Sequence, residues 1–158
     1  MEEIRFDDID GLRARISDEF GPWSKELEVT QAMINGFADL TGDHQWIHVD
    51  LERCKKESPF GGPIAHGFLT LSLLPALGGQ ADYKVVGYGN ATNYGADSLR
   101  FLSPVPAGSR IHSHGRLASV DARPKGTLLT QELAVHGVGQ ERPALIYRML
   151  ALYHPPIG

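Results

Sequence analysis

Residues 65–77 read AHGFLTLSLLPAL and form the most continuously apolar stretch of the chain. A helix that is apolar nearly all round is normally buried in a core rather than laid on a surface. The stretch contains Thr70, Ser72 and Pro75, and it is far shorter than the ~20 residues that a bilayer requires. It therefore predicts a buried core helix and no membrane span.

The sequence changes character after Gly78 and Gly79. β-Branched and aromatic residues then form runs that are separated by turn residues, a pattern typical of strands. These runs cover residues 83–90, 93–103, 109–121, 127–138 and 143–153. We expect four or five antiparallel strands from them. A core helix in the first half and successive strands in the second predict an α+β domain in which a sheet wraps one buried helix.

Three shorter helices are predicted upstream of the core helix. Thr30 can cap one of them and Gly42 can end it. The apolar residues of its buried face follow the three-to-four spacing of a helix: Met33, Ile34, Phe37, Ala38 and Leu40. Asp50 can cap a second helix, which residues 58–63 would break. Residues 1–22 carry charge and little periodicity, so they predict a short leading helix or a surface arm.

The composition is close to the average of globular proteins, and the length suits a compact, enzyme-sized domain. The chain has 158 residues, with 42% hydrophobic and 22% charged residues, and we expect residues 1–158 to form one domain. A net charge of -4 argues against a nucleic-acid partner, which would require a basic face. Cys54 is the single cysteine, so no intrachain disulfide can form. The acidic start lacks the features of a signal peptide, and we expect a cytoplasmic protein with no membrane partner.

The residues that suggest chemistry follow the predicted end of the helix at Gly42. Asp43 and His48 lie five positions apart on an irregular segment, where both side chains can point into one cleft. Addition of water to a double bond needs a base and an acid, and histidine with aspartate can supply both near neutral pH. In an arbitrary sequence this spacing more often marks a capping aspartate and a surface histidine. The surrounding residues decide between the two interpretations.

Residues 37–50 and 61–69 resemble the hydratase motif of the MaoC-like, (R)-specific enoyl-CoA hydratases. The match centres on Gly42-Asp43 and Ile47-His48. Where that motif has Asn-Pro, this chain has Gln45-Trp46, which is similar to the NodN-like subgroup. The likeness continues through residues 93–105, and by the order of its motifs it covers roughly residues 25–153.

The resemblance implies a hot-dog fold, in which a strongly curved antiparallel sheet surrounds a long central helix. Hydratases, dehydratases and thioesterases share this fold, so the fold does not settle the function. The family pairs its domains through their sheets and places each active site near the subunit interface. It therefore implies a homodimer, which would also cover an otherwise exposed sheet edge.

The resemblance also implies roles for individual residues. Asp43 and His48 would hold and activate the water, and the backbone N–H of Gly67 would face the thioester oxygen, where negative charge develops. Glycine at that position would let the substrate approach closely. Ser72 matches a position where some family members carry a serine near the site, although a helical serine often bonds to its own turn. For His66 we favour a structural role, with its ring hydrogen-bonded to a backbone carbonyl, over a catalytic one.

No metal or other cofactor is expected. His112, His114, His136 and His154 lie without a carboxylate at metal-ligand spacing. The glycine-rich segments do not form a nucleotide-binding motif and are typical of turns. His44 is expected to face solvent or to lie behind the catalytic pair. For Trp46 we favour an anchor that fixes the loop over a lid above the acyl chain.

The function expected from these patterns is that of an (R)-specific enoyl-CoA hydratase, or 3-hydroxyacyl-thioester dehydratase, which acts on an enoyl-CoA or an enoyl-acyl carrier protein. Two alternatives stay open. A hot-dog thioesterase would use a carboxylate to direct water at the thioester carbonyl, although the ordered Asp43–His48 pair argues against it. A non-catalytic subunit that binds acyl thioesters is the other, and an intact pair makes it the less favoured interpretation.

Overall fold

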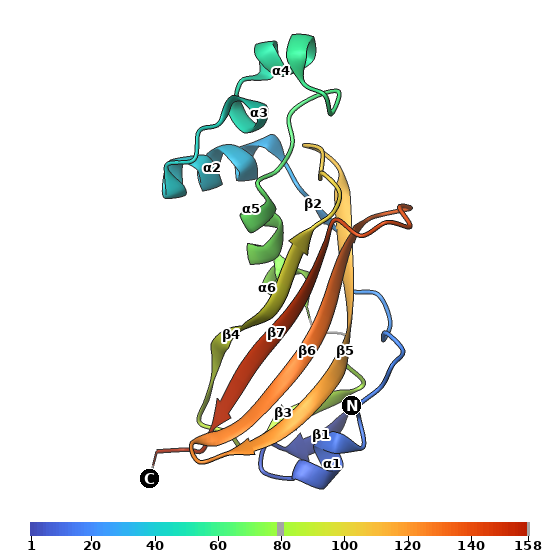
Figure 1. Ribbon diagram of the computed structural model, residues 1–158, viewed down its shortest axis with the longest axis vertical. Helices are drawn as coiled ribbons and strands as arrows, with labels where there is room; N and C mark the ends of the chain where they lie inside the picture. Colours follow the sequence, from blue (N-terminus) through green and yellow to red (C-terminus); the bar gives the residue numbers. More distant parts are fainter. Residues whose placement is uncertain (79–80, 158) are drawn as a thin grey trace.

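The computed structural model describes residues 1–78 and 81–157. The chain forms one long curled sheet, with three helices beyond one end of it and a small helix and strand pair near the other, where both termini lie (Figure 1). In chain order the elements are β1 (Glu2–Arg5), α1 (Ile9–Arg13), β2 (Leu27–Glu28), α2 (Gln31–Thr41), α3 (Trp46–Val49), α4 (Leu51–Glu57), α5 (Gly67–Ser72), α6 (Leu74–Leu77), β3 (Tyr83–Val86), β4 (Asn90–Phe101), β5 (Arg110–Arg123), β6 (Gly126–Gly137) and β7 (Leu145–His154).

The main sheet is antiparallel, and its strand order is β2-β5-β6-β7-β4. Its four long strands confirm the strands predicted over 93–103, 109–121, 127–138 and 143–153. The strand predicted over 83–90 is wrong in its extent. The chain turns after Val86, so β3 leaves the main sheet and pairs in parallel with β1, a strand that was not predicted.

The two edges of the main sheet differ. Residues 16–28 run along the outer edge of β5, where the N–H groups of Ser17, Gly21 and Ser24 donate to carbonyls of that strand. At the other edge, β4 pairs with β7, and no further strand joins it among the described residues. Except for half-buried Leu99, the residues of β4 are exposed. Most of β4 and its outer edge are therefore uncovered in a single chain.

The predicted helix caps are present. Thr30 Oγ1 accepts a hydrogen bond from the Met33 N–H at 3.2 Å, and α2 ends at Gly42, whose φ of 79° suits a residue without a Cβ. Asp50 Oδ1 accepts from the Arg53 N–H at 3.0 Å and starts α4. The short leading helix is also found, as α1. These local signals fix where the chain leaves α2 and enters α4.

The central helix is shorter and more exposed than predicted. It is divided into α5 and α6, because Pro75 has no N–H for a helical bond to the Leu71 carbonyl. Phe68 is 63% exposed, so the prediction of a helix buried all round is wrong. Among residues 1–78 and 81–157, no helix is long and apolar enough to cross a membrane.

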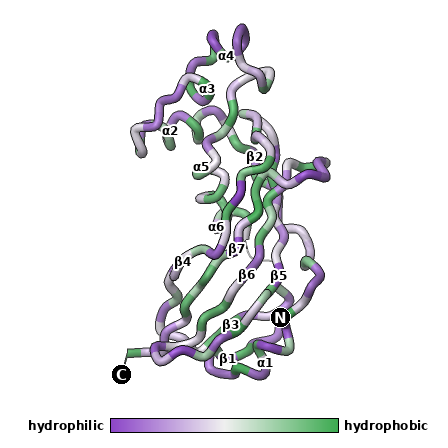
Figure 2. The backbone as a smooth tube through the Cα atoms, viewed as in Figure 1, coloured by the Kyte–Doolittle hydropathy of each residue, from purple (hydrophilic) through white to green (hydrophobic). Residues whose placement is uncertain are grey.

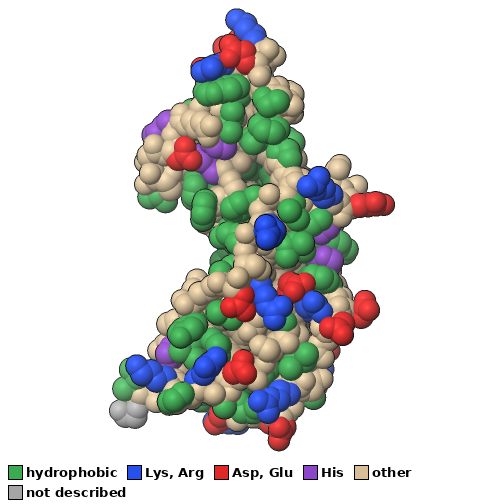
Figure 3. Space-filling model, in the orientation of Figure 1, with side chains coloured by type: hydrophobic (Ala, Val, Ile, Leu, Met, Phe, Trp, Pro, Cys, Tyr) green, Lys and Arg blue, Asp and Glu red, His purple; other side chains and the backbone are tan. Residues whose placement is uncertain are grey.

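Two hydrophobic clusters stabilise the fold. The first packs α2, α5 and α6 against β5 and β7, and the second packs α1 and β1 against β5 and β6. Many apolar residues lie along β6 and β7, whereas α4 is largely hydrophilic (Figure 2). A cavity of about 970 Å³ lies between α6, residues 14–22 and the sheet. The molecule narrows at the level of α5 and α6 (Figure 3).

Candidate active site

The structure brings together the two residues that the sequence selected. Asp43 lies in the loop after α2, and His48 lies in α3. With His66, which directly precedes α5, each offers a side-chain atom within 4.8 Å of the others. Asp43 is exposed, whereas His48 and His66 are only 6% and 3% exposed. A solvent-accessible carboxylate therefore lies beside two buried imidazoles.

The hydrogen bond of His48 defines which of its nitrogens can act as a base. Its Nδ1 lies 2.7 Å from the Ile64 carbonyl oxygen. Because a carbonyl only accepts, Nδ1 carries the hydrogen and Nε2 keeps a free lone pair. Burial lowers the pKa of His48, with a further lowering by His66, while the bond to Ile64 and the charge of Asp43 act in the opposite direction. The ring is therefore neutral near pH 7 and can accept a proton at Nε2.

The carboxylate of Asp43 is held by the loop that follows it. Asp43 Oδ1 accepts from the Gln45 N–H at 3.3 Å, and the Asp43 N–H donates to Thr41 Oγ1 at 3.4 Å. The backbone of Gln45 makes this contact, so the replacement of Asn-Pro by Gln45-Trp46 does not remove it. The exposed carboxylate retains acceptor capacity for a water molecule.

Gln31 holds α3 in place, and no sequence pattern pointed to it. Its Nε2 donates to the His48 carbonyl at 2.7 Å and to Asn35 Oδ1 at 2.9 Å. The Ile64 N–H donates to the Ile47 carbonyl at 3.0 Å and ties α3 to the segment before α5. Gln31 is 17 positions from His48, so only the folded chain shows that it supports this residue.

Gly67 is the first residue of α5, so its N–H has no acceptor within the helix. It lines a cavity of about 270 Å³ together with Ile64 and Thr70. A Cβ on Gly67 would meet the Phe101 ring at 2.8 Å. The space that glycine provides is thus occupied by Phe101 in this chain, whereas we expected it to admit substrate.

Ser72 is an exposed residue of α5, and its Oγ donates to the Phe68 carbonyl at 2.7 Å. This is the bond to its own turn that is common for a helical serine. Ser72 also lines the larger cavity of about 970 Å³. Gly67 lines the smaller cavity, so Ser72 and Gly67 do not border the same cavity.

The other polar and aromatic residues near the pair lie as follows. His44 Nε2 lies 2.9 Å from Asp39 Oδ1 on the surface, in agreement with the expected exposure. The Arg53 guanidinium lies 4.3 Å from the centroid of the half-buried Trp46 ring, and Cys54 Sγ donates to the Trp46 carbonyl. These contacts favour the interpretation of Trp46 as an anchor of α3 on α4.

A metal ion is not expected at this cluster. In the described part of the chain, Asp43, His48 and His66 form the one group of three close enough to share an ion. The two imidazoles stack with centroids 3.8 Å apart and planes inclined by 25°. Because the nitrogen lone pairs lie in the ring planes, nearly parallel rings do not direct them at one point.

We expect dialysis against EDTA to leave activity unchanged, because a neutral imidazole and a backbone N–H can perform the chemistry without an ion. The measurement is the initial rate before and after dialysis, with added Zn²⁺, Mg²⁺ or Mn²⁺ as controls. A loss of activity that one of these ions restores would contradict the expectation.

Known proteins resemble this chain in sequence. The sequence profile described as MaoC like domain matches residues 19–134. Nodulation protein N of Rhizobium meliloti is 42% identical over 96% of this chain and 92% of its own length. The 3-hydroxyacyl-thioester dehydratase Z of Mycobacterium tuberculosis is 42% identical over 94% of this chain and 97% of its own length.

Solved structures share the fold. The monoamine oxidase regulatory protein from Archaeoglobus fulgius has a TM-score of 0.74 and 28% identity, and the match covers 98% of this chain and 97% of that one. The (R)-hydratase from A. caviae has a TM-score of 0.66 over 86% of this chain and 97% of its own, and its 24% identity supports the fold alone. The hot-dog architecture is thereby confirmed, and the chain belongs to the MaoC-like domain family.

Proposed function

We propose that the protein is a hydro-lyase that adds water to a trans-2-enoyl thioester and removes it from the (R)-3-hydroxyacyl thioester. The observation that carries this proposal is the exposed Asp43 carboxylate beside the neutral His48, whose Nε2 is free to accept a proton. Relatives named 3-hydroxyacyl-thioester dehydratase and 3-hydroxybutyryl-CoA dehydratase support the same reaction class. The product configuration is carried over from the family.

In the hydration direction, Asp43 and His48 hold one water molecule. His48 Nε2 takes a proton from it as its oxygen bonds to C3 of the substrate. The electrons of the double bond move toward C2 and the thioester oxygen, where the Gly67 N–H stabilises the negative charge. A proton delivered to C2 by the pair completes the addition. Dehydration is the same sequence in reverse, so both directions use the same residues.

The test is the ultraviolet absorbance of the enoyl thioester after addition of the protein to crotonyl-CoA and to longer enoyl-CoAs. A decrease with formation of the (R)-3-hydroxyacyl-CoA supports the proposal. Release of free thiol would indicate that the protein is a thioesterase instead. Tight binding of acyl-CoA without any loss of absorbance would indicate that the protein is a non-catalytic binding subunit.

The substrate carrier and the cellular location belong to the same proposal. The acyl group is attached to coenzyme A or to acyl carrier protein, and the protein acts in the cytoplasm as one domain formed by residues 1–158. The buried thiol of Cys54, the single cysteine of the chain, is consistent with a reducing compartment. The reaction class fits fatty acid metabolism.

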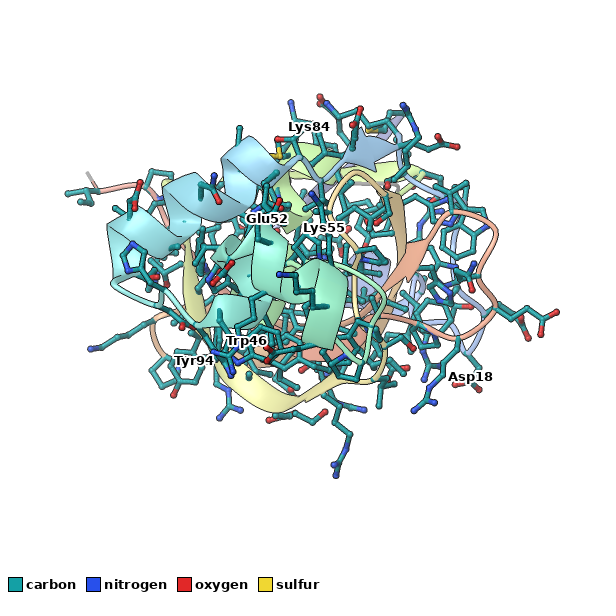
Figure 4. All side chains as sticks on the ribbon, turned by 90° about the horizontal axis from the view of Figure 1, so that it is seen from above. Asp18, Trp46, Glu52, Lys55, Lys84 and Tyr94 are labelled. Carbon is teal, nitrogen blue, oxygen red and sulfur yellow. The ribbon has the colours of Figure 1, made fainter. Side chains whose placement is uncertain are left out.

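We further expect a homodimer at micromolar concentration, formed across the open edge of β4. Large apolar side chains are exposed there, with Tyr94 at 64% and Phe101 at 44%. Tyr94 lies at the rim of the molecule, away from Asp18 of the segment that lines β5 (Figure 4). Burial of this edge and its aromatic rings would favour pairing.

Sedimentation velocity measures whether the protein is a monomer or a dimer. Tyr94→Asp should shift the protein toward the monomer by placing a charge on the edge, whereas Val138→Asp, at an exposed apolar position outside β4, should not. A strictly monomeric protein with full activity would contradict both the dimer and a site near its interface.

A further inference from the structure

We propose that His66 is a positioning residue for the reaction, whose single imidazole fixes the backbone of Asp43 and the ring of His48 in one arrangement. The inference rests on the proposed function, because it assumes that this pair performs the proton transfers. His66 is 3% exposed, so its contacts are with the protein. Two of these contacts reach the pair directly.

The first contact restrains Asp43. His66 Nε2 lies 2.9 Å from the Asp43 carbonyl oxygen, and because a carbonyl only accepts, Nε2 must donate. The two residues are 23 positions apart in the chain, and Asp43 lies on an irregular segment just after α2. The loop therefore gains a tertiary hydrogen bond at the residue that carries the carboxylate. Without it, the bonds that hold Asp43 to Thr41 and Gln45 are local to the loop.

The second contact restrains the ring of His48. The two imidazoles stack at 3.8 Å between centroids. The hydrogen bond from His48 Nδ1 to the Ile64 carbonyl fixes one edge of that ring, and the stack fixes the plane of the ring. The lone pair of Nε2 can therefore point in only one direction. Phe37 of α2 packs against His66 at 5.0 Å between centroids. His66 cannot turn away from His48 without disturbing this contact.

Helix capping does not explain the histidine. His66 occupies the cap position of α5, but in the described part of the chain its side chain makes no capping hydrogen bond. Its Nδ1 is buried, and no described residue bonds to it. Serine, threonine, asparagine or aspartate would cap α5 better and would avoid this unfavourable burial. The favourable contacts of the imidazole are those made with Asp43, His48 and Phe37.

Two variants separate the two contacts. His66→Phe keeps a flat ring for the stack and removes the N–H donor, whereas His66→Gln keeps an N–H donor and removes the ring. Loss of one buried contact should lower kcat about tenfold while KM stays within about twofold, since the substrate-binding groups remain. His44→Phe and His44→Gln are matched controls at an exposed histidine beside Asp43, and both should retain the parent kcat.

The titration of His48, followed by NMR of its ring signals, gives a readout that does not depend on activity. Burial and then His66 lower the pKa of His48, and Asp43 is the other charged group that acts on it. Replacement of His66 should therefore raise the pKa of His48 in both variants, and the acid limb of the kcat/KM profile should move to higher pH with it. A residue needed only for folding would lower the melting temperature and leave this titration unchanged.

The outcomes separate this inference from the proposed function. Folded His66 variants with the parent kcat and the parent His48 titration would overturn the positioning role. If the parent protein has no hydratase activity but the His48 titration still shifts in the His66 variants, the proposed function is wrong. The contact between His66 and His48 would then still be supported. In the parent protein, ¹⁵N shifts should report Nε2–H for His66 and Nδ1–H for His48. The opposite tautomer at His66 would eliminate the bond to Asp43 and overturn the inference without any variant.

Discussion

Asp43→Asn and His48→Gln should each lower kcat by roughly two to four orders of magnitude, the usual contribution of a positioned acid or base. Both substitutions keep size and hydrogen-bonding capacity while they remove proton transfer. The carboxylate is exposed, so its loss leaves no unpaired buried charge. In His48→Gln, the introduced amide could still donate to the Ile64 carbonyl, which His48 Nδ1 reaches at 2.7 Å. The fold and substrate binding should therefore persist while the chemical step fails.

Steady-state rates with crotonyl-CoA measure the loss of kcat. Circular dichroism and sedimentation show whether each variant keeps the fold and the oligomeric state of the parent protein. The double variant should be little worse than either single one, because two groups that act on one water molecule do not contribute additively. His66→Gln gives the internal comparison, since its expected loss is smaller than that of the pair. Single variants that remain folded and hydrate at close to the parent rate would show that the mechanism is wrong.

Gly126→Ala should lower the free energy of unfolding by about 3 kcal/mol or more, which places it among the severe single substitutions. Gly126 begins β6 with a φ of 141°, a conformation that residues with a Cβ rarely adopt. A Cβ there would overlap the carbonyl oxygen of Tyr153 on β7. The backbone of β7 would have to move, and with it the pairing of β6 and β7.

Gly139→Ala is the matched control for this prediction. Gly139 also has a positive φ, of 80°, but its Cβ would meet no described atom within 4 Å. Only the conformational cost remains, about 1 kcal/mol. Urea denaturation of the parent and both variants measures the difference. Equal losses in the two variants would show that the contact with Tyr153 is not the cause.

Much of the fold could be predicted because its signals are local. Thr30 and Asp50 accept bonds from N–H groups three positions ahead, so a short sequence window contains the whole interaction. Burial alternates along the first residues of β5, from Arg110 to His114, and a short window of sequence shows such alternation as well. The pair of Asp43 and His48 could be predicted for the same reason, because the two residues are only five positions apart in the sequence, although His48 lies in the short helix α3 and not on the irregular segment that we expected.

The features that were missed depend on contacts between distant segments. Nothing near Gln31 predicts that its amide reaches the His48 carbonyl, and nothing near Gly67 predicts that Phe101 takes the space above it. The apolar character of residues 65–77 was visible, but composition does not show that Phe68 stays uncovered in a single chain. The parallel pairing of β1 with β3 joins segments about 80 residues apart and left no local pattern.

The unequal edges of the main sheet limit how far this protein can associate. Residues 16–28 line the outer edge of β5 from Arg110 to Leu117, so a second molecule cannot pair with that part of the strand. Within the main sheet, β4 is the edge strand along which no further segment of the described chain pairs. Two such edges that meet about a twofold axis satisfy each other and leave none for a third molecule. Edge-to-edge growth of the main sheet therefore stops when two molecules have paired. The arrangement of the strands disfavours fibres even though no single described residue blocks the edge.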